Sequence, residues 1–103
     1  MENKGKALLV DDEPLNLGFM SGYLADIGYD VATASSGEEA LAIVAANMPD
    51  IILIDIMMPG LNGYQVTRKL KNKRETSNMP IVLVTALGAK QGSKALRRAR
   101  SLI

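Results

Sequence analysis

The stretch DIILIDIMMPG, from Asp50 to Gly60, decides how this chain can fold. Asp50 is followed by four apolar residues and then by a second acid, Asp55, directly before a Met-Met-Pro-Gly turn. A nearly continuous run of Ile and Leu is typical of a central strand that is buried on both faces of a parallel sheet. A carboxylate at the end of such a strand is costly if it is buried without compensation. We therefore predict a strand over 50–55. We also expect another group to compensate the negative charge of Asp55.

Short apolar runs alternate with longer helical segments on both sides of this stretch. Four strands that alternate with helices indicate an α/β fold, a doubly wound parallel sheet with helices on both faces. The other predicted strands are KALLV (6–10), DVATA (30–34) and PIVLVT (80–85), and the predicted helices begin at Pro14 and cover SSGEEALAIVAAN (35–47) and NGYQVTRKLKN (62–72).

Two helices carry clear local signals. Ser36 is expected to cap the second helix, and the acids Glu38 and Glu39 suit the dipole of its first turn. The first helix is expected to end at Gly28. Its apolar residues are predicted to fall mostly on one face, and they are Leu15, Leu17, Phe19, Met20, Tyr23, Leu24 and Ile27.

The composition restricts the classes of protein that the chain can belong to. With 103 residues, 48% of them apolar, it is expected to form a single domain over 1–103. The sequence contains neither cysteine nor histidine, which removes disulfides, thiolate metal sites and the commonest general base. No run is long and apolar enough for a membrane span and the start, MENKGK, is polar, so a cytoplasmic protein without a membrane partner is expected.

Charge is distributed unevenly along the chain, although the net charge is only +1. Residues 1–67 contain ten acids and two bases, whereas residues 68–103 contain ten bases and one acid, Glu75. An acidic pole and a basic pole are therefore predicted, and each is a candidate functional surface.

Acids and a hydroxyl follow three of the predicted strands. The first strand ends at Asp11 and Asp12, the third at Asp55 and the fourth at Thr85. Ligands bind at the carboxyl ends of strands in such folds, and these ends share one edge of the sheet. Three carboxylates that meet there would repel one another, and a hard divalent cation such as Mg²⁺ would relieve the repulsion. We therefore predict that Asp55 shares a magnesium ion with the acids after the first strand.

Each of these residues also has a simpler interpretation. Asp11 or Asp12 could cap the helix that begins near Pro14. Asp55 could be a partly solvated acid at a strand end, and Thr85 a structural β-branched residue. Their combination at three separate strand ends favours the functional interpretation over any residue taken alone.

The segments LLVDDEPLN (8–16), PDIILIDIMMPGLNGYQV (49–66) and MPIVLVTA (79–86) resemble the receiver domain of two-component response regulators, which has a CheY-like, flavodoxin-like fold. The resemblance covers residues 6–86. It implies that Asp55 is the phosphoacceptor, that Asp12 and Asp55 bind Mg²⁺ with the main-chain carbonyl of Met57, and that Asp11 assists through water. It also implies that the hydroxyl of Thr85 donates to a phosphoryl oxygen and that the partner is a sensor histidine kinase or a phosphotransfer protein.

The sequence departs from this family after Ala86, where it continues as LGAKQGSKALRRARSLI (87–103). No Lys-Pro pair occurs, so the fifth strand, its phosphate-contacting lysine and the fifth helix of a receiver are expected to be missing, as in a truncated or altered domain. Loss of one such preorganised group typically costs roughly 3–4 kcal/mol of transition-state stabilisation. The sequence over 88–103 predicts a basic helix that is atypical of the family. Its apolar side could pack against the sheet, its bases could form a binding patch, or the ending could be foreign to the family.

A missing fifth strand would leave the fourth as an exposed apolar edge, which could pair with a second copy in a homodimer. Nucleic acid is not an expected partner, because no aromatic residue accompanies the bases of the tail.

Three functions are compatible with these features. The leading hypothesis is a non-enzymatic phosphoacceptor switch. The second is a pseudo-receiver, impaired in phosphorylation, that acts as an interaction module. The third is a Mg²⁺-dependent phosphohydrolase, although Met57 stands two residues after Asp55, where such an enzyme would need a second acid.

Overall fold

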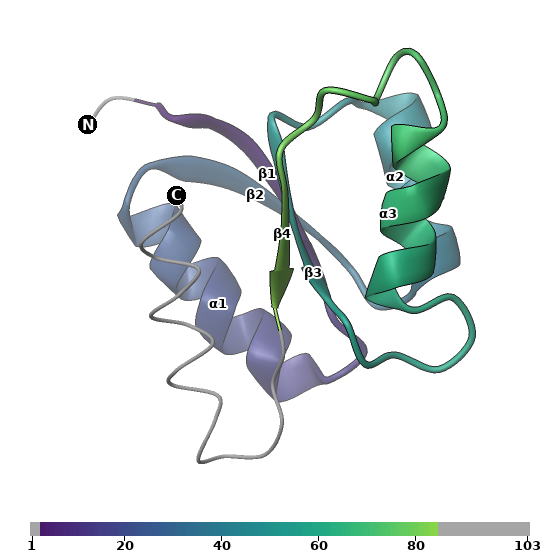
Figure 1. Cartoon of the computed structure of the whole chain (residues 1–103). Helices are drawn as coiled ribbons and strands as arrows, with labels where there is room; N and C mark the ends of the chain where they lie inside the picture. The colour runs from purple at the N-terminus through teal and green to yellow at the C-terminus, as the bar shows by residue number, and fades with distance from the viewer. Residues whose placement is uncertain (1–2, 85–103) are drawn as a thin grey trace.

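A computed structural model describes residues 3–84 as four parallel strands and three helices in strict alternation (Figure 1). The strands pair in the order β2-β1-β3-β4, which places β1 and β3 at the centre of the sheet. The predicted α/β fold and its elements are confirmed to within a few residues at each end. The elements are β1 (Gly5–Val10), α1 (Pro14–Asp26), β2 (Tyr29–Ala34), α2 (Gly37–Ala46), β3 (Ile51–Asp55), α3 (Gly63–Lys71) and β4 (Ile81–Val84).

The helices form layers on both sides of the sheet, as the doubly wound prediction requires. Figure 1 shows α1 on one side and α2 with α3 on the other. Alternate residues of β1 and β3 accordingly enter two different cores. Leu8 and Ile52 pack with α2 and α3, whereas Leu9 and Leu53 belong to the core beneath α1. All five residues of β3 are buried, which confirms that DIILID forms a central strand.

Side chains at the helix starts explain where α2 and α3 begin. The hydroxyl of Ser36 accepts a hydrogen bond from the Glu39 amide at 3.1 Å, so the predicted cap is confirmed. In α3, Asn62 and Gln65 each accept from the other's main-chain amide at 2.9 Å, which completes a capping box.

What was expected of the chain after β4 remains a prediction. Among the described residues β4 is one of the two edge strands, and its residues Ile81, Leu83 and Val84 are half-buried. Thr85, the predicted basic helix over 88–103 and the predicted loss of a fifth strand and a fifth helix all lie outside the described residues. Pairing of the β4 edge in a homodimer is therefore not tested.

The start of α3 lies against the end of β3, and a glycine permits this contact. A Cβ atom at Gly63 would stand 2.5 Å from the main-chain oxygen of Asp55, which is closer than atoms can approach. The Gly63 amide also donates to the carbonyl of Ile56 at 3.2 Å. The absence of a side chain at Gly63 thus lets α3 brace the backbone of Asp55.

We expect Gly63→Ala to lower the free energy of unfolding by roughly 1–3 kcal/mol, because the new methyl group would displace backbone atoms. Gly18→Ala is the matched control, since Gly18 lies inside α1 and a Cβ atom there would meet nothing within 4 Å. This control should stabilise the protein by about 0.5–1 kcal/mol through helix propensity. Urea denaturation measures both values, and equal effects of the two substitutions would contradict the close contact at Gly63.

Candidate metal and phosphoacceptor site

Three carboxylates meet at the carboxyl edge of the sheet. Asp11 and Asp12 directly follow β1, and Asp55 is the last residue of the neighbouring strand β3. One carboxylate oxygen from each of the three lies within 4.8 Å of the others. The structure therefore brings together the three acids that the sequence analysis placed at this edge.

Two of the acids are buried and held by main-chain amides. Asp11 and Asp55 are each 7% exposed, whereas Asp12 is exposed. One oxygen of Asp11 accepts from the amide of Glu13 at 2.9 Å, and one oxygen of Asp55 accepts from the amide of Met57 at 3.1 Å. Each bond occupies one carboxylate oxygen, and no main-chain amide within residues 3–84 binds the second.

The simpler interpretations of these acids do not hold. The residue at the N-cap of α1 is Glu13, followed by Pro14, and no side chain caps the helix. Asp11 binds the amide of Glu13 before the helix begins, so neither Asp11 nor Asp12 acts as the helix cap. Asp55 is buried among the strand ends, so it is not a solvated acid either.

Burial and mutual repulsion make the negative charge of this cluster unfavourable. Burial, together with the nearby charges of Asp11 and Asp12, raises the pKa of Asp55 from 3.8 to about 6, against the lowering effect of the Met57 amide. Burial also raises the pKa of Asp11, more than the amide of Glu13 lowers it. The cluster thus lacks a positive partner among the described residues.

The donor atoms fit a hard divalent cation. All three side chains offer oxygen, and the sequence has no histidine or cysteine that would favour zinc or a softer metal. The raised pKa values mean that the ionised carboxylates are unfavourable at this site, and a bound cation would stabilise them. Of the other predicted ligands, Met57 lies in the loop after β3 with its side chain 63% exposed, and Thr85 falls outside the described residues.

Most of the apolar residues of α1 pack against one core, as predicted, and two do not. Leu15 and Phe19, assigned to that face, are 81% and 67% exposed. Together with Gly18 and Gly22, which have open space around them, they form a solvent-facing stripe at helical spacing. This stripe begins beside the acidic cluster, because α1 follows Asp11 and Asp12 directly.

The raised pKa of Asp55 predicts how stability depends on pH in the metal-free protein. Between about pH 4 and pH 6 the folded chain keeps a proton on Asp55 that the unfolded chain releases, so stability falls as the pH rises. At about pH 7 we expect Asp55→Asn to raise the free energy of unfolding by roughly 1–2 kcal/mol, with little effect near pH 4.

Urea denaturation in the presence of a chelator measures this difference. Asp30→Asn, on β2 outside the cluster, is the control and should give no comparable gain with rising pH. A stabilisation by Asp55→Asn that is as large at low pH as at neutral pH would show that charge burial is not its cause.

Known proteins resemble this chain over most of its length. The probable transcriptional regulator ycf27 of Guillardia theta is 47% identical over 88 residues, which cover 85% of this chain and 34% of the regulator. The response regulator PleD of Caulobacter vibrioides is 46% identical over 82 residues, which cover 80% of this chain and 18% of PleD. The chain thus spans about a third or less of these curated relatives.

Solved structures share its fold. The N-terminal domain of a response regulator receiver protein from Methanoculleus marisnigri JR1 superposes with a TM-score of 0.78 at 31% identity, over 91% of this chain and 80% of that one. The chemotaxis protein CheY4 of Vibrio cholerae gives a TM-score of 0.74 at 33% identity, over 88% and 78% of the two chains.

No helix within residues 3–84 is long and apolar enough to cross a membrane. The family model of the response regulator receiver domain matches residues 7–100, a range that contains all three acids of the cluster and extends beyond Ala86. The match covers most of the chain and agrees with both the fold and the relatives. The chain therefore belongs to the family of response regulator receiver domains.

Proposed function

We propose that this receiver domain accepts a phosphoryl group on Asp55 from a phosphohistidine and thereby changes its contacts with partner proteins. The observation that carries the proposal is the juxtaposition of Asp11, Asp12 and Asp55, with ligand oxygens within 4.8 Å at the carboxyl edge of the sheet. Asp12 and Asp55 would hold Mg²⁺ with the main-chain carbonyl of Met57, and Asp11 would contact it through water. When bound, the ion neutralises charge on the carboxylates and on the transferring phosphoryl group.

Asp55 is suited to be the nucleophile. Its bond from the Met57 amide fixes one carboxylate oxygen, and the second oxygen is available to attack phosphorus. A P–O bond to Asp55 forms as the P–N bond to the donor histidine breaks, and the histidine nitrogen retains the bonding electron pair. A carboxylate nucleophile needs no general base, so the absence of histidine in this chain is no obstacle.

The family and the loop after β3 favour a switch over a phosphohydrolase. Met57 presents a thioether, which can neither donate nor accept a proton for repeated hydrolysis of the acyl phosphate. The pseudo-receiver alternative predicts that Asp55 is not stably modified. We expect this chain to act as a phosphoacceptor switch and not as an enzyme. We also expect it to function in the cytoplasm.

The exposed stripe on α1 is a suitable docking surface for the phosphodonor protein. Leu15 and Phe19 are large apolar side chains in water, and Gly18 and Gly22 between them allow another helix to approach closely. Because the stripe starts beside the acidic cluster, a kinase or phosphotransfer protein bound there could present its histidine to Asp55. This docking mode is part of the proposal.

The phosphoacceptor role is tested with a small phosphodonor, Mg²⁺ and intact-protein mass spectrometry. We expect the wild-type chain to gain one phosphoryl group, and Asp55→Asn to gain none. Asp12→Asn should retain the acceptor but require at least about tenfold more Mg²⁺, because one of the proposed ligands loses its charge. An unmodified wild-type chain would support the pseudo-receiver, and steady release of inorganic phosphate over many turnovers would support the phosphohydrolase.

The docking surface gives a separate prediction. Phe19→Ala should lower phosphoryl transfer from a histidine-phosphorylated donor protein by at least about tenfold, the effect of losing a buried aromatic anchor. It should leave labelling by the small phosphodonor unchanged. Tyr64→Ala is the control, since Tyr64 is also an exposed aromatic residue but lies on α3, across the sheet. Equal losses with both donors would place Phe19 in the folding of the site and not in docking.

A further inference from the structure

A groove lies between the second half of α2 and the end of α3, far from the acidic cluster. Its volume is about 210 Å³. It is lined by Leu41, Val44, Ala45 and Met48 on the α2 side and by Leu70, Lys73, Glu75 and Thr76 on the other. We call it the α2–α3 groove. The α3 helix starts beside Asp55 and runs away from it, so the groove lies toward the opposite edge of the sheet (Figure 1).

The groove has an apolar floor and an open rim. Val44 and Leu70 are 4% and 2% exposed and form the floor, whereas Met48 at the rim is 44% exposed. Its volume is suited to one large aliphatic or aromatic side chain. Partly exposed apolar pockets of this kind are where partner proteins insert the anchor residues that dominate their affinity.

The surface of α2 beside the groove carries no charge. The sequence from Ala40 to Met48 contains no acid and no base, and Ala42, Ala45 and Ala46 are exposed. The outer face of a helix that only meets water is normally charged or polar. A neutral face of small side chains therefore favours contact with another apolar surface.

The chain segment on the other side of the groove is mainly basic. Five bases occur from Arg68 to Arg74 and only one acid, Glu75, adjoins them. Lys71 has a structural role, because its ammonium group donates to the carbonyls of Ser77 and Met79 at 3.1 and 2.7 Å. The remaining bases, Arg68, Lys69, Lys73 and Arg74, are exposed. Lys73 lines the groove itself together with the acid Glu75, so the excess of positive charge comes from the bases around the groove.

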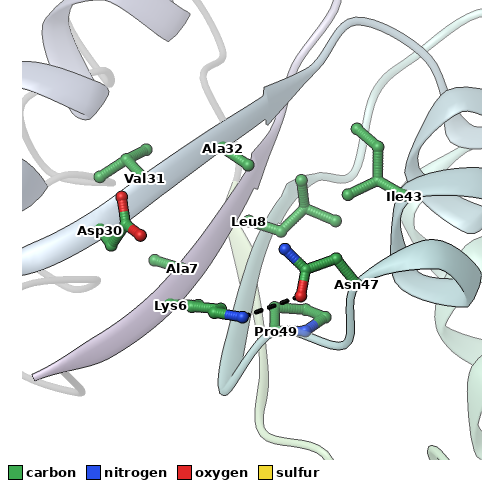
Figure 2. A pocket seen from close by; sticks show the side chains of 9 residues that line it. All are labelled: Lys6, Ala7, Leu8, Asp30, Val31, Ala32, Ile43, Asn47 and Pro49. Atoms are coloured by element: carbon green, nitrogen blue, oxygen red, sulfur yellow. Dashed lines mark hydrogen bonds between the residues drawn. The ribbon is translucent and has the colours of Figure 1, made fainter.

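A second hollow, on the other side of α2, does not have these properties. It is smaller, about 70 Å³, and its lining combines the polar residues Lys6, Asp30 and Asn47 with apolar ones (Figure 2). The ammonium group of Lys6 already donates to the side-chain oxygen of Asn47 at 2.8 Å across it. With about a third of the volume of the α2–α3 groove, this hollow is too small for a large apolar anchor.

From this combination we propose that the α2–α3 groove binds an acidic amphipathic segment of a partner protein, which inserts one large apolar side chain beside Val44 and Leu70. Its carboxylates would face Lys73 at the groove and the exposed bases of the segment 68–74 beside it. Complementary charge around an apolar anchor is the usual means of orienting such a segment. The proposal does not depend on phosphorylation of Asp55.

The charges argue against other occupants. Residues 85–103 contain five bases and no acid, so this segment of the chain would repel the basic rim. A symmetric contact with a second copy would bring two basic rims together. The lining contains no aromatic residue on which a nucleic-acid base could stack.

The test is an NMR titration of the ¹⁵N-labelled full chain at low ionic strength. The probe is a synthetic amphipathic helical peptide with leucine along one face and glutamate on the others, and the control peptide has lysine in place of glutamate. We expect the acidic peptide to shift the amide signals of Leu41, Ala45 and Lys73, and to bind at least about tenfold more tightly than the basic one. The effect should weaken as salt is added.

A matched pair of variants locates the binding. Ala45 lines the groove, whereas Ala46 is exposed on the same helix and lines neither hollow. Ala45→Glu should weaken binding of the acidic peptide at least about tenfold, and Ala46→Glu should leave it within about twofold, with circular dichroism confirming that both variants fold. Lys73→Glu should weaken binding as well.

Several results would overturn the proposal. Equal effects of Ala45→Glu and Ala46→Glu, equal binding of the two peptides, or signal shifts confined to α1 would each do so. Sedimentation that shows a dimer broken by Ala45→Glu would assign the groove to a second copy. Binding to vesicles of anionic lipid without binding to the acidic peptide would assign it to a membrane surface.

Discussion

The repulsion among three carboxylates at one edge of the sheet is the constraint on which the site depends. Parallel pairing of β1 with β3 brings Asp11 and Asp12 beside Asp55, and the buried strand leaves Asp55 little access to water. Within residues 3–84, the backbone contributes one amide to each of these two buried acids and no side chain contributes a positive charge. The fold thus builds a site with unfavourable charge, and such a site gains stability when a cation or a proton is bound.

The same arrangement explains why the surrounding loops are built as they are. Gly63 lets the start of α3 touch the main chain of Asp55, and the turn between them includes Gly60 in a left-handed conformation with φ of 71°. These contacts fix the backbone that carries the side chain of Asp55, the proposed phosphoacceptor. A rigid support matters because phosphoryl transfer depends on positioning and charge stabilisation more than on proton transfer.

Much of the fold and of the acidic site could be predicted from the sequence. The run from Ile51 to Ile54 identified the central strand, and the rule that parallel strands share a carboxyl edge was sufficient to gather the three acids. The cap at Ser36 was also predicted, because it depends on residues three positions apart.

Features that depend on tertiary packing could not be predicted. The α1 helix is apolar around most of its circumference, so spacing alone could not show that Leu15 and Phe19 face water. Choosing between Asp11 as a helix cap and as part of a cluster required the position of Glu13. The α2–α3 groove results from how two helices and a turn pack together, and no local motif marks it.

The central claim is that Asp11, Asp12 and Asp55 form one cation site around the phosphoacceptor. It is tested most directly by anomalous X-ray diffraction from crystals of this chain grown with Mn²⁺, which takes the same oxygen ligands as Mg²⁺. We expect an anomalous peak bound to the side chains of Asp12 and Asp55 and to the carbonyl of Met57. A fully bound ion elsewhere, with these carboxylates turned away from one another, would contradict the claim.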